Sequence, residues 1–142
     1  MWMKVSKIIY GAIFVLSGIL IAINTLFYSF YHRYLLNFLV PDLGYSVVLI
    51  TIGIISLAFI RSSDIIKLSS SLLVSTIMST MLFILRTLTI MSHWIDAYIL
   101  TLEGEEYLFN LFEEMNYLEI YLAPLTIILL IYSYHVLRKY TI

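Results

Sequence analysis

Charged residues are scarce in this chain of 142 residues. Lysine, arginine, aspartate and glutamate supply 12% of the sequence, against about 25% in an average soluble domain. By contrast, 62% of the residues are hydrophobic and the mean hydropathy is +1.00. A soluble domain of this size could not keep so much apolar surface out of water. The composition therefore excludes a soluble enzyme, a nucleic-acid-binding protein and a disordered tail, and it indicates a membrane protein.

Cysteine is absent, so the chain can form no disulfide, no thiolate metal site and no redox pair. The motifs of common membrane enzymes are missing as well: the sequence contains no HExxH, no GxSxG and no aspartate-rich metal motif. It also lacks the inverted pair of broken helices that is typical of secondary transporters. We therefore expect a protein that catalyses no reaction and holds no cofactor.

Long stretches that are nearly free of charge predict the architecture. A helix that crosses the hydrocarbon core needs roughly 20 apolar residues. Four such stretches lie at about 8–31, 43–60, 68–94 and 118–137. The sequence therefore predicts an all-α, polytopic membrane protein, a four-transmembrane-helix bundle that forms a single membrane domain over residues 1–142.

The basic residues predict the orientation of the bundle, because positively charged flanks tend to stay in the cytoplasm. With four spans, most of them fall on one side of the membrane. These residues are Lys4, Lys7, Arg61, Lys67, Arg138 and Lys139. We therefore expect a multi-pass protein of the cell membrane with both termini in the cytoplasm.

The loops contain helix-capping and amphipathic patterns. Asp42 is placed to cap the second span, and Ser62, Ser63 or Asp64 to cap the third. Between the third and fourth spans, the segment 105–115 alternates apolar and acidic positions at helical spacing, which predicts a short amphipathic helix at the membrane surface.

The predicted outer surface is acidic, and its carboxylates are candidates for contact with a partner or a cation. They are Asp96, Glu103, Glu105, Glu106, Glu113 and Glu114. A divalent-cation site that combines some of them with His93 is chemically possible, although the spacing matches no known metal loop. Solvated acids on a wet helix face are the simpler interpretation.

Small residues mark a packing face on the first span. Gly11, Gly18, Ala22 and Thr25 fall within a narrow arc at 3.6 residues per turn. Helices in lipid associate through close backbone approach, so this stripe predicts tight contact with another helix, in the same chain or in another.

A line of polar residues runs along the third span. Within about a quarter of the helix circumference it carries Ser71, Ser75, Ser79, Arg86, Thr89 and His93. The fourth span has a corresponding face with Glu119, Ala123, Thr126 and Ser133. Because the two spans are antiparallel, Arg86 and Glu119 come to a similar depth, and we predict that they pair. The alternative is that the Arg86 side chain extends to the headgroups without a partner.

Three functions from different classes fit these patterns. The leading hypothesis is a non-catalytic accessory or structural subunit, bound in the lipid bilayer to other membrane subunits or to copies of itself. The second is an oligomer that transports protons, ions or small solutes along the Arg86 and Glu119 polar line. The third is a redox subunit that binds haem or quinone near His32 and His93.

Overall fold

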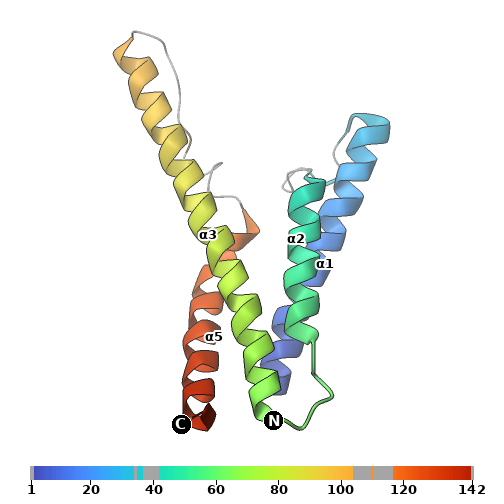
Figure 1. The fold of residues 1–142 in the computed structure, drawn as a ribbon. Helices are drawn as coiled ribbons and strands as arrows, with labels where there is room; N and C mark the ends of the chain where they lie inside the picture. The colour runs from blue at the N-terminus through green and yellow to red at the C-terminus, as the bar shows by residue number, and fades with distance from the viewer. Residues whose placement is uncertain (1, 34, 37–41, 104–109, 111–116, 142) are drawn as a thin grey trace.

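The structure is a computed structural model that describes residues 2–33, 35–36, 42–103, 110 and 117–141, with the backbone alone at 118–119 and 141. Over these residues the chain forms four helices, α1 (Trp2–Tyr31), α2 (Leu43–Leu57), α3 (Ile65–Leu102) and α5 (Leu118–Thr141), and no strand. The all-helical prediction is confirmed for this part of the chain (Figure 1). The predicted surface helix at 105–115 lies outside the described residues, apart from Asn110.

Three of these helices, α1, α3 and α5, are long and apolar enough to cross a membrane. Helix α2 has 15 residues, or about 22 Å at 1.5 Å per residue, which is shorter than the hydrocarbon core of about 30 Å. It ends at Leu57, before the predicted limit at residue 60, because the backbone turns at Phe59, which adopts a left-handed φ of 58°. Helix α3 instead continues past the predicted limit at residue 94 and ends at Leu102.

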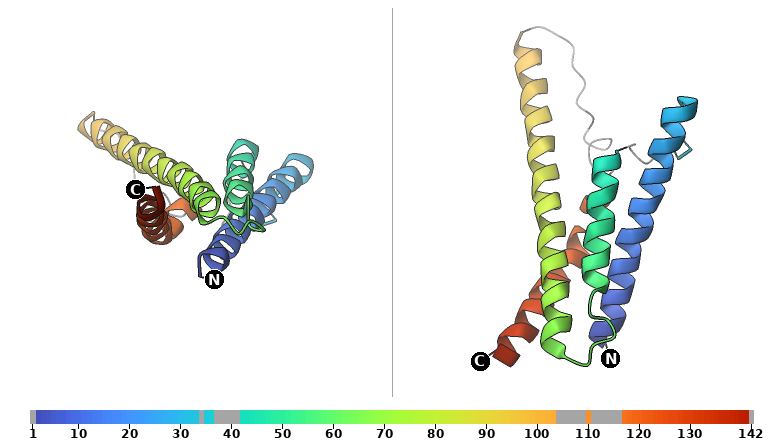
Figure 2. Two further views of the ribbon diagram at one scale, coloured as in Figure 1. Left: turned by 60° about the horizontal axis from the view of Figure 1, so that its bottom comes forward. Right: turned by 45° about the vertical axis from the view of Figure 1, so that its right-hand side comes forward.

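The helices alternate in direction, so that both termini and the connection between α2 and α3 lie at one end of the molecule (Figure 1). We call this the terminal end and the opposite end the distal end. Helix α1 packs along α2, and α3 packs along α5. The two pairs are close together at the terminal end and diverge toward the distal end, as both views in Figure 2 show.

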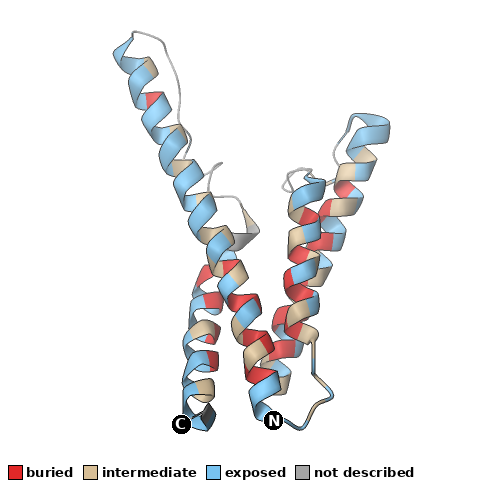
Figure 3. Cartoon of the chain, in the orientation of Figure 1, coloured by how far each residue is buried: buried red, intermediate tan, exposed pale blue. Residues whose placement is uncertain are grey.

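The divergence of the two pairs determines where the hydrophobic core lies. Buried apolar side chains from all four helices meet in one cluster, which consists of Tyr10, Phe14, Ile21, Leu49, Ile52, Leu72 and Leu129. On α3, burial is concentrated in the half nearest the terminal end, and the distal half is largely exposed (Figure 3).

Aspartate side chains begin the two central helices. Asp42 accepts a hydrogen bond of 2.9 Å from the amide of Tyr45 and caps α2, as predicted. Of the three candidates at the start of α3, the cap is Asp64, which accepts a 2.9 Å bond from the amide of Ile66. Asp64 also lies 4.0 Å from Lys67, but an exposed ion pair of this kind contributes little stability.

Glycines set the separation of α1 and α2. A Cβ atom added at Gly18 would lie 2.8 Å from the Ser46 carbonyl oxygen, and one added at Gly53 would lie 2.7 Å from the Gly11 carbonyl oxygen. The two backbones are therefore in direct contact, with Gly11 and Gly18 of the small-residue stripe facing α2. Ala22 and Thr25, farther along the stripe, are half-buried, and the Thr25 hydroxyl donates to the carbonyl of Ile21.

Candidate functional site

The polar line of α3 has two parts with different surroundings. In the half nearest the terminal end, Ser71, Ser75 and Ser79 are buried, whereas in the distal half Thr89 is exposed. The difference arises because α3 leaves α1 and α2 as it runs outward (Figure 1). We refer to the buried part as the polar face of α3.

Lys7 lies at the terminal end of this face with its whole side chain buried. Its Nζ atom donates to the carbonyl oxygens of Ala58 at 2.7 Å and Leu68 at 3.2 Å, and to the Ser71 hydroxyl. Ala58 is the residue at the C-terminus of α2, where carbonyl groups lack helical partners and the helix dipole favours a cation. One ammonium group therefore joins the start of α1 to the end of α2 and the start of α3.

A cluster of hydroxyls joins three helices in the middle of the bundle. Thr126 of α5 lies 3.3 Å from the Tyr10 hydroxyl of α1 and 3.3 Å from the Ser79 hydroxyl of α3. All three side chains are almost completely buried. Because an unpaired hydroxyl in an apolar interior is costly, these mutual contacts hold α5 in register with the other two helices.

Two further buried hydroxyls of α3, those of Ser75 and Thr76, are used within the helix. Ser75 and Thr76 each donate to the carbonyl of Leu72 at 2.9 Å. Bonds of this kind satisfy a hydroxyl locally without joining it to its neighbours along the face. A transport role for the polar line remains a prediction from the sequence.

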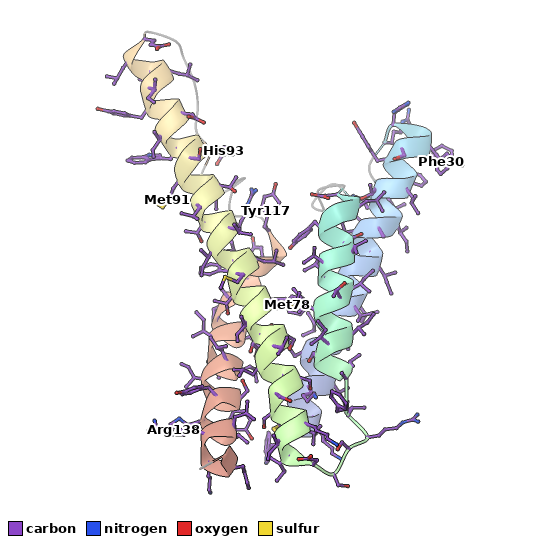
Figure 4. All side chains as sticks on the ribbon, viewed as in Figure 1. Phe30, Met78, Met91, His93, Tyr117 and Arg138 are labelled. Atoms are coloured by element: carbon purple, nitrogen blue, oxygen red, sulfur yellow. The ribbon has the colours of Figure 1, made fainter. Side chains whose placement is uncertain are left out.

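Arg86 is half-buried at the point where α5 begins. Its guanidinium carbon lies 3.2 Å from the centre of the Tyr117 ring, a cation–π contact with the residue that precedes α5 (Figure 4). The Glu119 side chain lies outside the described residues, so the predicted pair with Arg86 stays a prediction.

The two histidines near which the sequence predicts haem or quinone come from two helix pairs that diverge toward the distal end (Figure 1). His32 follows the end of α1 and contacts Tyr28 edge-on, with ring centres 6.4 Å apart. His93 is half-buried on the distal part of α3 (Figure 4). The redox hypothesis stays a prediction from the sequence.

Two of the predicted surface acids are described. Asp96 is exposed on α3, and Glu103, also exposed, is the capping residue that follows this helix. Glu105, Glu106, Glu113 and Glu114 lie outside the described residues. In the part of the chain that the structure describes, no three histidine or acidic side chains gather in a group that could hold a metal ion.

Sequence reasoning missed two polar residues of α1. It placed Lys7 only among the basic flanks of the spans, although Lys7 is four residues before Gly11 and therefore belongs to the stripe that faces α2. It also passed over Asn24, which is buried. The Asn24 side chain accepts from the amides of Leu35 and Leu36 at 2.9 Å and donates to the Leu36 carbonyl at 3.3 Å, so it fixes the chain after α1.

Comparison of the chain with protein-family models, with curated proteins and with solved structures finds no match.

Proposed function

We propose that this protein is a small integral membrane subunit that works by binding other membrane proteins or copies of itself, without catalysing a reaction. The observation that carries the proposal is the length of α3 and the exposure of apolar side chains on its distal part. This helix has 38 residues and is therefore about 57 Å long, whereas a bilayer with its headgroups is about 40–45 Å thick. It extends past α1 and α2 (Figure 2).

The side chains on this extension are large, apolar and exposed. Met91, Ile95, Tyr98 and Leu102 are between 47% and 70% exposed. Their spacings of four, three and four residues place them in one stripe along the helix. If α3 stands upright, the last two turns, which carry Tyr98 and Leu102, lie beyond the headgroups, where exposed apolar side chains indicate a protein contact. A strong tilt would instead return the stripe to lipid.

Site-specific photocrosslinking in native membranes distinguishes these arrangements. A photoreactive residue at Tyr98, which is 61% exposed, is compared with one at Ile128 of α5, which is 64% exposed. We expect a discrete protein adduct from position 98 and lipid adducts from position 128. When two differently tagged copies are present together, an adduct that carries both tags indicates self-association, and an adduct that carries one tag indicates binding to another subunit. Lipid adducts alone at both positions would contradict the proposal.

The same proposal includes the topology. We infer that α2 is the second of four membrane crossings and that both termini are cytoplasmic, which is supported by the alternating helix directions and by the basic residues at the terminal end. Because the chain lacks cysteine, single cysteines report accessibility without background. In intact cells, a membrane-impermeant maleimide should label Glu103→Cys and leave Ser63→Cys unlabelled. The reverse pattern would overturn the orientation.

A further inference from the structure

An open cavity of about 600 Å³ lies at the terminal end of the bundle. Its walls come from the first turn of α1, the start of α3 and the last turns of α5, three segments that are far apart in the sequence. The polar part of the lining consists of Lys4, Ser63, Tyr132, Lys139 and Tyr140. Its volume falls in the range of small-ligand sites, roughly 300–1,000 Å³.

The lining is positively charged. Lys4 and Lys139 come from opposite ends of the chain, and no aspartate or glutamate stands with them among the described residues of the lining. Asp64 lies between Ser63 and Ile65 of the lining in the sequence, but its carboxylate accepts from the amide of Ile66 and lies 4.0 Å from Lys67. The described lining therefore combines two lysines with hydroxyl-bearing side chains, a combination that suits a phosphate group.

The other part of the lining is apolar. Ile65, Leu68 and Val136 contribute aliphatic side chains, and the exposed Trp2 also lines the cavity. Tryptophan and tyrosine at the end of a membrane helix are typical of the level of the lipid headgroups. A ligand with a phosphate at one end and a hydrocarbon chain at the other matches both parts of this cavity, whereas a free phosphate would leave the apolar part without a contact.

We propose that this cavity binds the headgroup of an anionic phospholipid. Lys4 and Lys139 bind the phosphate from two sides, the hydroxyls of Ser63 and Tyr132 donate to its oxygens, and the aliphatic side chains contact the first carbons of the acyl chains. Basic pockets between helices at the cytoplasmic face of a membrane are a recognised setting for such lipids.

Tryptophan fluorescence in lipid vesicles tests the proposal directly. The chain has two tryptophans, so Trp94→Phe leaves Trp2 at the cavity as the single reporter. Vesicles of phosphatidylcholine receive equal small fractions of either brominated phosphatidylglycerol or brominated phosphatidylcholine, since bromine quenches tryptophan at short range. We expect stronger quenching by the anionic lipid.

The variants separate a built site from general surface charge. Lys4→Gln with Lys139→Gln should lower the anionic preference about fivefold for each lysine removed, and the double Lys→Arg variant should keep it. Arg61→Gln with Arg138→Gln removes the same charge from exposed positions outside the cavity lining and should leave the preference unchanged.

Three results would overturn the proposal. They are equal quenching of Trp2 by the two lipids, an equal loss of preference in the arginine control, and a loss of the preference when inorganic phosphate is added at constant ionic strength. The last result would assign the cavity to a soluble phosphate.

Discussion

Alanine substitutions at the glycines between α1 and α2 test whether direct backbone contact holds these helices together. A methyl group at Gly53 would lie 2.5 Å from Val15 Cγ2, 2.7 Å from the Gly11 carbonyl oxygen and 2.8 Å from the Val15 amide nitrogen. Two of these three atoms belong to the backbone, so a rotamer change cannot remove the overlap. The helices must separate, which weakens the contacts on both sides of the glycine.

The expected cost follows from the atoms that must move. Overpacking a close contact costs about 1–3 kcal/mol, and the better helix propensity of alanine returns up to about 1 kcal/mol. At Gly11 the two nearest atoms belong to the Leu57 side chain, at 2.6 and 2.9 Å, and can shift, while the nearest backbone atom, the Gly53 carbonyl oxygen, lies farther away at 3.0 Å. After this offset we expect Gly53→Ala and Gly18→Ala to lower the free energy of unfolding by about 1–2 kcal/mol, and Gly11→Ala to lower it less.

Gly44 is the matched control, because it lies in the first turn of α2 and is exposed. Among the described residues, a methyl group there would meet only the Asp42 Oδ1 atom, at 3.3 Å. Gly44→Ala should change the free energy of unfolding by less than about 0.5 kcal/mol. Steric trapping in micelles measures these free energies. The reasoning is refuted if Gly53→Ala is as stable as Gly44→Ala, or if Gly11→Ala is the costliest variant.

Three further contacts give predictions of their own. Asn24→Leu removes three hydrogen bonds to the chain after α1, each worth about 1 kcal/mol, so hydrogen exchange at the two amides that it binds should become at least about tenfold faster; unchanged protection would show that the side chain does not fix this segment. In a double-mutant cycle, Tyr10→Phe and Thr126→Val should couple by about 0.6 kcal/mol, and strictly additive losses would argue against the hydroxyl contact. Arg86→Gln and Tyr117→Leu should couple by about 0.5–2 kcal/mol through the cation–π contact. The same unfolding measurement detects this coupling, and a value near zero would exclude a stabilising contact.

Composition and local periodicity were sufficient to predict the class of protein and most helix positions. An excess of apolar residues in long uncharged stretches is a property of the chain itself. The Asp42 cap is equally local, because its partner Tyr45 is three residues away. The largest difference is at the end of α3, where the predicted span was set by the nearly uncharged stretch before Asp96, while the helix itself continues to Leu102.

The interaction partners of the polar residues needed the tertiary structure. The position of Lys7 in the sequence is that of a membrane flank, and it is buried only because the end of α2 and the start of α3 bring carbonyl oxygens to its Nζ atom. Similarly, the polar line of α3 is one continuous pattern in the sequence. Packing near the terminal end buries Ser79, whereas the divergence of α3 from α1 and α2 leaves Thr89 exposed. Helical periodicity determines which residues share a face, and the packing of distant segments decides whether that face meets protein, lipid or water.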